Sequence, residues 1–279
     1  MNAQPKHFVA DQQARAKYEK LREILQRYQK VIVAYSGGLD SVFLLRTAVD
    51  CLGADHVLAC IGLSESLAQS EYQSALEIAR QMGAKIQVVH PKEISNPHYR
   101  ANSADRCFYC KTELYKLLVD IAEKQNYDTV LCGTNIDDLG DFRPGLQAAK
   151  DLNVASPLEQ AGLTKDDIRR LSKQLALPTW NKPAQPCLAS RMSYGLEITP
   201  ERLKQIEQGE EFLRKLNLTQ LRVRHHDKLV RIEVPNEQID IITQQGTREK
   251  IVNFFKKLGF TYVTLDLQGF RSGSGNEML

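Results

Sequence analysis

The stretch that decides the fold is VIVAYSGGLDS, residues Val31–Ser41. Its first half, Val31–Tyr35, is a short apolar run typical of a buried parallel strand. The second half holds two adjacent glycines and leads directly into an apolar pattern of helical period that starts at Val42. A strand, a tight glycine turn and a helix start aim backbone N–H groups at one position. That geometry suits a phosphate or pyrophosphate group.

Each residue of this turn has an expected role in binding the anion. Gly37 and Gly38 let the backbone approach it without a Cβ clash. Ser36 and Ser41 add hydroxyl donors, and Asp40 is expected to hold Mg²⁺ or a hydroxyl of the substrate. The chain has no Walker A motif. SGGLDS instead resembles the PP-loop of ATP pyrophosphatases, adenine nucleotide α-hydrolase-like enzymes that cleave ATP between its α and β phosphates; the alternative is a glycine turn without a ligand.

Length and composition indicate an ordinary soluble protein. The 279 residues are 42% hydrophobic and 25% charged, which favours two domains with sizeable cores. A net charge of +3 gives no reason to expect a nucleic-acid or membrane partner. Neither a long apolar stretch nor a secretory signal is visible, so we expect a cytoplasmic protein. Six cysteines in that setting favour thiols or a metal site over disulfides.

Strands and helices alternate through the first two thirds of the chain. After Val31–Tyr35, the expected strands are residues 56–63, 85–90, 128–132 and a short one at 154–157, and the expected helices are residues 9–29, 67–82, 107–124 and 164–175. The alternation predicts an α/β fold with a doubly wound parallel sheet. Ligands of such sheets lie at the carboxyl ends of the strands. Gly133, Thr134 and Asn135 follow the fourth strand, so we expect them to help hold the nucleotide, although a plain strand-end turn would look the same.

The pattern changes after residue 178. Pro178–Pro200 is rich in proline and serine and resembles a hinge. Beyond it, the expected helices are residues 201–216, 237–244 and 250–258, and the expected strands are residues 220–225, 229–234 and 262–266. We therefore expect a PP-loop domain over residues 1–180 and a smaller α+β domain, for substrate binding and oligomerisation, over residues 181–279.

The cysteines carry the second chemical signal. Cys107 and Cys110 form a C-x-x-C at a predicted helix start, so both sulfurs lie on one face. This spacing fits a redox pair, half a zinc site or half an iron–sulfur site. Cys187 lies four residues before Arg191, which is expected to lower the pKa of its thiol or to bind a phosphate. The other cysteines lie in apolar runs and are expected to be small buried hydrophobes.

Taken together, several short segments resemble the LarE family: SGGLDS, RCFYCK, GTNIDD, PCLASR, RVRHHD and QGFRSG. Members of that family are PP-loop sulfur transferases that make the dithiolated pyridinium nucleotide used as the nickel-pincer cofactor. One branch sacrifices the sulfur of a single cysteine, at the position of Cys187. The other holds a 4Fe–4S cluster on three cysteines, at the positions of Cys107, Cys110 and Cys187. The resemblance to this second branch implies ATP, Mg²⁺ and a 4Fe–4S cluster as cofactors.

The resemblance also implies roles for individual residues. ATP would adenylate a carboxylate of a pyridinium dicarboxylate mononucleotide, and sulfur from the cluster would convert it to a thiocarboxylate. Cys187, Asp40 and Lys111 are the expected catalytic residues, with Lys111 steadying charge at the acyl centre. The residues expected to bind the substrate are Ser190, Arg191, Glu211, Arg222, Arg224 and Glu233. The two arginines of RVR share one face of a predicted strand, which suits a bidentate anion clamp.

Two other functions fit part of this pattern. A PP-loop tRNA thiolase also pairs ATP with a cluster on three cysteines, but the near-neutral charge and the lack of an added RNA-binding module count against it. A non-catalytic iron–sulfur carrier regulated by nucleotide would not need an adenylating loop. We therefore expect a small-molecule substrate, no nucleic-acid or membrane partner, and a homo-oligomer.

Overall fold

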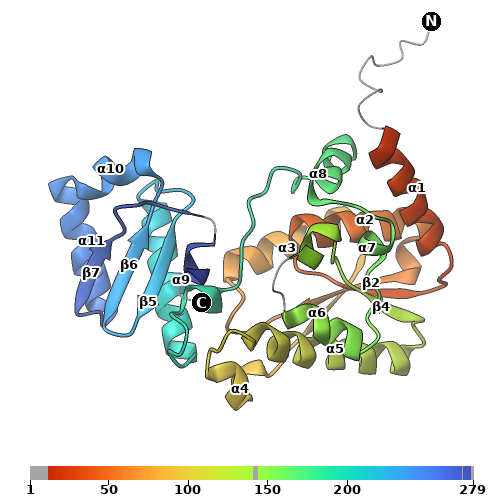
Figure 1. Ribbon diagram of the computed structural model, residues 1–279, viewed down its shortest axis with the longest axis horizontal. Coiled ribbons are helices and arrows are strands. Elements are labelled where there is room, and N and C mark those ends of the chain that lie inside the picture. The colour runs from red at the N-terminus through yellow and green to blue at the C-terminus, as the bar shows by residue number, and fades with distance from the viewer. Residues whose placement is uncertain (1–11, 141–143, 272, 278–279) are drawn as a thin grey trace, which may run out of the picture. The chain divides into compact units, whose positions relative to one another are not determined.

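The computed structural model describes residues 12–140, 144–271 and 273–277, and its residues fall into two compact units (Figure 1). The first unit comprises the described residues up to Ser64 together with Gln69–Pro91 and Cys107–Gln185. The second comprises Glu65–Ala68, Lys92–Arg106 and the described residues from Pro186 onwards. The chain therefore passes between the units more than once. The division of functions between residues 1–180 and 181–279 stays a prediction.

A four-stranded parallel sheet forms the centre of the first unit, in the order β3-β2-β1-β4. Its strands are β1 Val31–Ala34, β2 Val57–Gly62, β3 Lys85–Val89 and β4 Thr129–Leu131. Val31 pairs with Val57 on one side and with Thr129 on the other. The two middle strands are buried almost throughout because helices cover both faces, with α2 and α3 on one face and α5 and α6 on the other (Figure 1). The predicted doubly wound α/β fold is confirmed.

Most helices of this unit form where the sequence pattern predicts them, whereas those over residues 144–151 and 157–160 were not predicted. They are α1 Gln12–Leu25, α2 Leu39–Leu52, α3 Gln69–Gln81, α5 Arg106–Gln125, α6 Pro144–Asp151, α7 Pro157–Gln160 and α8 Lys165–Gln174, with 3-10 turns η2 Ala54–His56 and η4 Ile136–Gly140. The predicted strand at residues 154–157 is wrong in extent, because only a single parallel bridge forms, between Leu131 and Ala155. Pro157 begins α7 two residues later and has no N–H to extend a ladder.

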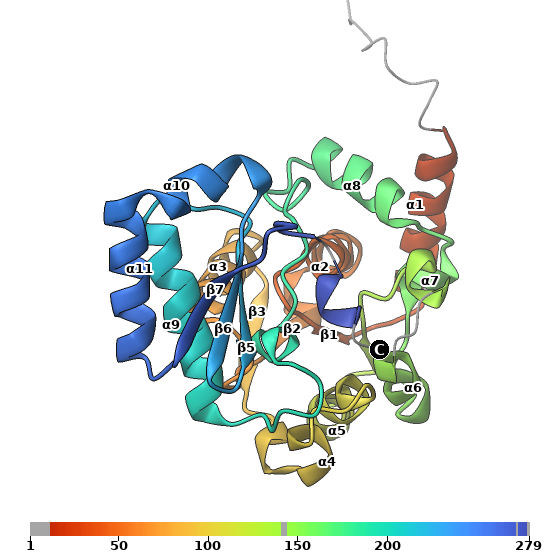
Figure 2. The same cartoon turned by 60° about the vertical axis from the view of Figure 1, so that its left-hand side comes forward.

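The second unit is built on a three-stranded sheet in the order β5-β6-β7. Its strands are β5 Arg222–His226, β6 Leu229–Glu233 and β7 Tyr262–Leu265. Strands β5 and β6 form an antiparallel hairpin, and β7 joins β6 in parallel. Its helices and 3-10 turns are η3 Glu93–Ser95, α4 Pro97–Arg100, η5 Leu188–Arg191, α9 Pro200–Lys215, η6 Asn236–Gln238, α10 Ile239–Thr243, α11 Gln245–Lys257 and η7 Ser274–Asn276. Figure 2 shows this α+β arrangement from a second direction, with α9 and α11 beside the strands.

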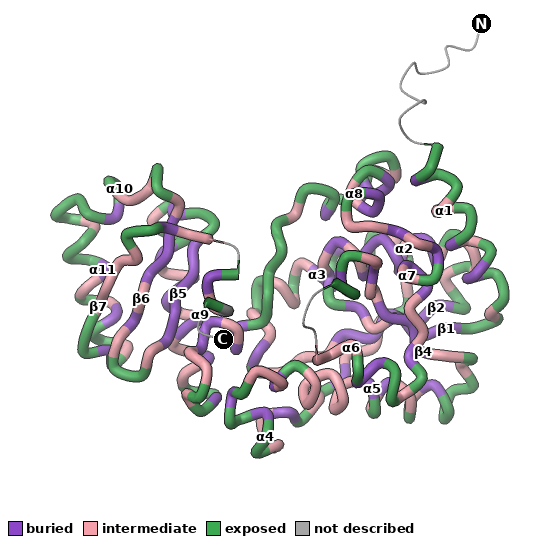
Figure 3. The backbone as a smooth tube through the Cα atoms, in the orientation of Figure 1, coloured by how far each residue is buried: buried purple, intermediate pink, exposed green. Residues whose placement is uncertain are grey.

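Burial is concentrated on β1, β2 and β4 of the first sheet and on β5 and β6 of the second, whereas the outer faces of the helices are exposed (Figure 3). In the described part of the chain, none of the helices has both the length and the apolar character that crossing a membrane requires.

Close packing of α9 against α11 holds the second unit together at Gly209. A Cβ atom added there would lie 2.7 Å from Cε1 of Phe255 and 3.3 Å from Cγ1 of Val223. Both neighbours are fully buried, so neither has room to move away. This position therefore requires glycine for its lack of a side chain.

We expect Gly209→Ala to lower the free energy of unfolding by about 1–3 kcal/mol, because the added methyl group overpacks the contact with Phe255. Denaturant unfolding of the purified protein measures this change. The matched control is Gly246→Ala in α11, where an added Cβ meets nothing within 4 Å and stability should change by less than about 0.5 kcal/mol. Equal stability of the two variants would contradict this account of the packing.

A buried histidine lies on β5 of the same unit. His225 is 2% exposed, its Nε2 lies 2.9 Å from Oε1 of Gln205, and its ring meets that of Phe260 edge-on at 4.9 Å. Gln205 uses its own Nε2 to donate to the carbonyl of Leu258, so its oxygen accepts from a neutral His225 that carries the proton on Nε2. Burial lowers the pKa of His225 to about 4.

The pKa of His225 in the folded protein lies below its ordinary value near ~6.5, so the folded state favours the neutral ring. As the pH falls below ~6.5, the unfolded chain takes up a proton that the folded protein does not, and the free energy of unfolding falls. We expect a loss of about 2–3 kcal/mol of unfolding free energy between roughly pH 6.5 and pH 4 from this residue. His225→Gln should remove that part of the pH dependence, whereas His56→Gln, at an exposed position, should leave it unchanged. Parallel stability–pH curves for wild type and His225→Gln would rule out this role.

Candidate functional site

The glycine turn between β1 and α2 has the geometry of an anion-binding loop. Gly37 has a φ of +70°, and a Cβ there would lie 2.5 Å from the Cβ of Ala75 in α3. Glycine is therefore required at this position on two grounds, conformation and space. Gly38 precedes α2 and offers no side-chain cap, so the N–H groups of the first helical turn remain directed at the end of β1.

The two serines of the turn face each other across it. Their hydroxyl oxygens lie 3.1 Å apart, and the backbone N–H of Ser36 donates to Oγ of Ser41 over 3.2 Å. Ser41 in turn donates to the carbonyl of Gly38. The hydroxyls predicted as donors for an anion thus also brace the loop in its shape.

The end of β4 packs directly on the first turn of α2. A Cβ at Gly133 would lie 3.1 Å from the backbone nitrogen of Ser41 and 3.3 Å from the Cβ of Asp40. Asn135 is fully buried and donates from Nδ2 to Oδ1 of Asp40 over 3.4 Å. Thr134, between them, places its hydroxyl 3.3 Å from Sγ of Cys132. The residues predicted from two separate strand ends are therefore brought together around Asp40.

The structure adds Lys165, which the sequence analysis missed. Its Nζ lies 3.8 Å from Oδ2 of Asp40, and its backbone N–H donates to Asp137 over 2.7 Å. Asp138 caps the same loop by accepting from the backbone N–H of Asn135. A lysine at the first position of a helix opposes the helix macrodipole, and this was the available sequence signal.

The C-x-x-C motif lies at the start of α5, with Cys107 exposed and Cys110 partly exposed. All six cysteines lie in the described part of the chain, and none of them forms a disulfide. Cys187 is exposed and immediately precedes η5, and it belongs to the second unit, whereas Cys107 and Cys110 belong to the first. Among the described residues, no group of three or more His, Cys, Asp or Glu side chains is arranged to hold a metal ion. The three-cysteine cluster stays a prediction.

Lys111 places a positive charge beside these thiols. Its Nζ lies over the ring of Tyr115, 5.5 Å from the ring centre. The pKa of Lys111 is raised by the Tyr115 phenol first and then, against the effect of burial, by the thiols of Cys110, Cys132 and Cys107. An ammonium held charged in this way can stabilise negative charge that develops next to it.

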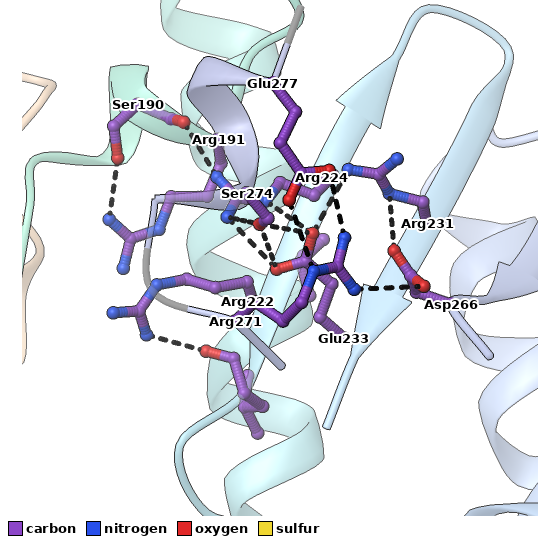
Figure 4. Close-up of polar contacts among 12 residues, drawn as sticks. Ser190, Arg191, Arg222, Arg224, Arg231, Glu233, Asp266, Arg271, Ser274 and Glu277 are labelled. Carbon is purple, nitrogen blue, oxygen red and sulfur yellow. Dashed lines mark hydrogen bonds and ion pairs between the residues drawn. The ribbon is translucent and has the colours of Figure 1, made fainter. Parts of the chain in front are cut away.

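In the second unit, Arg191 fixes the segment around Cys187 (Figure 4). Its side chain is 3% exposed, and its Nε lies 3.0 Å from Oε1 of Glu210, which is equally buried. Nη1 donates to the carbonyl of Cys187 over 3.0 Å and to Oγ of Ser190 over 3.1 Å. Arg224 donates to the carbonyl of the same Ser190 over 3.0 Å. Hydrogen bonds thus link four of the residues predicted from the sequence, which are Cys187, Ser190, Arg191 and Arg224.

Arg224 and Glu233 form a bidentate pair across the β5–β6 hairpin. Nε and Nη2 of Arg224 lie 2.9 and 3.0 Å from the two carboxylate oxygens of Glu233, which is fully buried. Arg222 lies two residues away along β5, with its guanidinium 5.0 Å from the ring centre of Phe270. The prediction that the two arginines share a strand face agrees with this arrangement.

Three buried arginines give this region a positive potential. The pKa of Arg222 is lowered to about 10, by burial first and then by the charges of Arg191 and Arg224, which Glu210 and Glu233 offset only in part. Burial disfavours a charge of either sign, but the net positive contribution of the neighbouring guanidiniums favours an anion in the same place.

Glu210 is the acidic residue that sequence reasoning did not identify. It accepts from both Arg191 and Arg214, whereas the predicted Glu211, next along α9, takes part in neither ion pair. Glu210 falls at the spacing of the buried residues Leu203, Ile206 and Leu213. A glutamate on an apolar helix face needs a buried cation, and this was the signal for it.

The chain is similar to known proteins over most of its length. The family model described as NAD synthase matches residues 14–127, which include the glycine turn and the C-x-x-C motif. An uncharacterised protein of Synechocystis, slr1717, is 42% identical over 95% of this chain and 98% of its own length. The pyridinium-3,5-bisthiocarboxylic acid mononucleotide synthase of Lactiplantibacillus plantarum is 38% identical over 91% of this chain and 92% of its own length. An uncharacterised protein of Methanocaldococcus jannaschii, MJ0830, is 33% identical over 88% of this chain.

These matches extend over both units, so they concern the nucleotide loop, the thiols and the arginine region alike. The chain therefore belongs to the LarE family of PP-loop, ATP-dependent sulfur transferases.

Proposed function

We propose that this protein uses ATP to activate a carboxylate of a pyridinium dicarboxylate mononucleotide and converts it to a thiocarboxylate, in the synthesis of the nickel-pincer nucleotide cofactor of lactate racemase. The name of the Lactiplantibacillus relative supports this substrate, and it favours a small molecule over tRNA. The observation that carries the proposal is the convergence of two strand ends on Asp40, because adenylation needs a triphosphate site with a carboxylate beside it.

Adenylation begins with ATP on the glycine turn. The backbone of Gly37 and Gly38 and the hydroxyls of Ser36 and Ser41 hold its phosphates, and Asp40 holds Mg²⁺. An oxygen of the substrate carboxylate attacks the α-phosphorus, the bond between α-phosphorus and the bridging oxygen breaks, and pyrophosphate leaves with that oxygen. Gly133, Thr134 and Asn135 line the nucleotide at the neighbouring strand end.

The substrate's phosphate is assigned to the arginine region of the second unit. Ser190, Arg191, Arg222 and Arg224 supply donors, and Glu211 and Glu233 orient the nucleotide. The positive potential at Arg222 supports this assignment, because a phosphate monoester is the most highly charged group of such a substrate. Carboxylates in the same network keep the arginines ordered when no anion is bound.

Cys107, Cys110 and Cys187 are the residues that would hold a 4Fe–4S cluster, and the donor set fits one, because all three are free cysteines at exposed or partly exposed positions. Such a cluster on three thiolates supplies an iron without a protein ligand, where a transferable sulfide can bind. Lys111 stabilises negative charge on the acyl oxygen as sulfur replaces AMP. The alternative within the family is that Cys187 gives up its own sulfur.

We expect Asp40→Ala to lower the rate of pyrophosphate release by about 10²-fold, because the phosphates lose their metal-holding carboxylate. A coupled pyrophosphate assay with ATP and the mononucleotide measures the rate. Asp50→Ala, at the exposed end of the same helix, is the control and should act as wild type. An unchanged rate in Asp40→Ala would refute the assigned role.

We expect protein purified without oxygen to contain about four irons and a matching amount of acid-labile sulfide, with a broad absorption band near ~400 nm. Replacing Cys107, Cys110 or Cys187 by alanine should abolish iron retention and sulfur transfer, while Cys51→Ala should retain both. Full iron content in all three variants would eliminate the cluster. Little iron in the wild type, with loss of one H₂S in mass after turnover, would identify Cys187 as a sacrificial donor.

A further inference from the structure

The segment Gly273–Glu277, here called the C-terminal turn, lies on the arginine region of the second unit (Figure 4). Ser274 is 3% exposed, and its hydroxyl accepts from Nη2 of Arg224 over 2.7 Å. The same hydroxyl lies 3.0 and 3.1 Å from the two oxygens of Glu233 and donates to them. The Ser274 hydroxyl, a neutral group of the protein itself, thus forms hydrogen bonds with both members of the Arg224–Glu233 ion pair.

The backbone of the turn packs closely against the guanidinium of Arg224 at Gly275. A Cβ added to Gly275 would lie 3.0 Å from Nη1 of Arg224 and 3.5 Å from the carbonyl oxygen of Ser190. Its far end is held by Glu277, whose oxygens lie 3.2 and 3.1 Å from Nε and Nη2 of Arg271. Glu277 is 59% exposed in this pair and Arg271 is 31% exposed, so the ion pair adds little stability.

Arg224 has few donors left for a ligand. Both hydrogens on Nη2 are used, one by Glu233 and one by Ser274, while Nε donates to Glu233 and Nη1 donates to Ser190. Among the described residues, the second Nη1 hydrogen has no acceptor, so a phosphate that takes two hydrogen bonds from Arg224 must displace a partner. Displacing Glu233 would break the bidentate pair of a fully buried carboxylate and leave it only the partly exposed Arg231, 3.1 Å away, which is costly. Ser274 is neutral, so displacing its hydroxyl leaves no buried charge unpaired, and it is the partner that leaves.

We propose that the C-terminal turn is a removable cover of this anion site, and that the phosphate of the substrate takes the position on Arg224 that Ser274 Oγ holds here. The inference rests on the proposed function, since it assumes that a phosphate binds this region. The inference adds that the turn covers the anion site when no substrate is bound. The apparent affinity for the substrate phosphate is therefore reduced according to the fraction of molecules in which the turn is docked.

The test uses two variants of the full chain that leave its charge unchanged. Ser274→Ala removes the hydroxyl, and Gly275→Val introduces a side chain that cannot fit against Arg224. Binding of inorganic phosphate is measured by calorimetry, with α,β-methylene ATP filling the glycine turn of the first unit. We expect each variant to bind phosphate about five- to tenfold more tightly than wild type, the equivalent of about one lost hydrogen bond.

Two further measurements complete the design. Gly246→Ala, at an open position on α11, should bind phosphate as wild type does, and Arg224→Ala should abolish binding. In wild type, phosphate should increase hydrogen exchange at the amides of Ser274 and Glu277, which donate to carbonyls within the turn and its approach.

Equal or weaker phosphate binding by both Ser274→Ala and Gly275→Val, alongside clear binding by wild type, would show that the turn is a fixed part of the site and would overturn the cover. Two other results would contradict the proposed function itself. If wild type fails to bind phosphate, or if Arg224→Ala binds as well as wild type, the phosphate site of the proposed function is wrong, and the cover falls with it.

Discussion

The approach of the β4 end to the first turn of α2 is the constraint on which the nucleotide site depends. Gly133 has no room for a side chain beside Asp40 and Ser41, and Gly37 has none beside Ala75. These two close contacts fix where the first helical turn begins relative to the sheet. The same contacts bring Asn135 within reach of Asp40, so backbone packing sets the position of the carboxylate.

The arginine region of the second unit depends on buried charge. Arg191 pairs with Glu210 and Arg224 with Glu233, all nearly inaccessible to solvent. Such pairs add little net stability, because desolvation offsets their attraction, but breaking one leaves an uncompensated charge. These ion pairs therefore act mainly by fixing the positions of the side chains that form them. Arg191 uses its remaining donors to hold the backbone at Cys187, which links the arginine region to the thiol chemistry within this unit.

Local signals predicted most of the fold. The helix predicted at residues 164–175 forms as α8 and begins with a capping box, in which Thr164 and Asp167 each accept from the other's backbone N–H. The helix predicted at residues 237–244 is split into a 3-10 turn, Asn236–Gln238, and the short α10, and α11 begins earlier than predicted. The signals at these boundaries were weak, so packing within the unit determined them.

The sequence alone determined the glycine turn, the thiol pair on one helical face and the two arginines on one strand face, because helical and strand periods are local properties. Only the tertiary structure decided which partners these groups meet. Lys165 lies beside Asp40, and Glu210 rather than Glu211 pairs with Arg191. Ser274 forms a hydrogen bond with Arg224. Each of these contacts joins segments far apart in the chain, and such contacts depend on how whole elements pack, which no local pattern encodes.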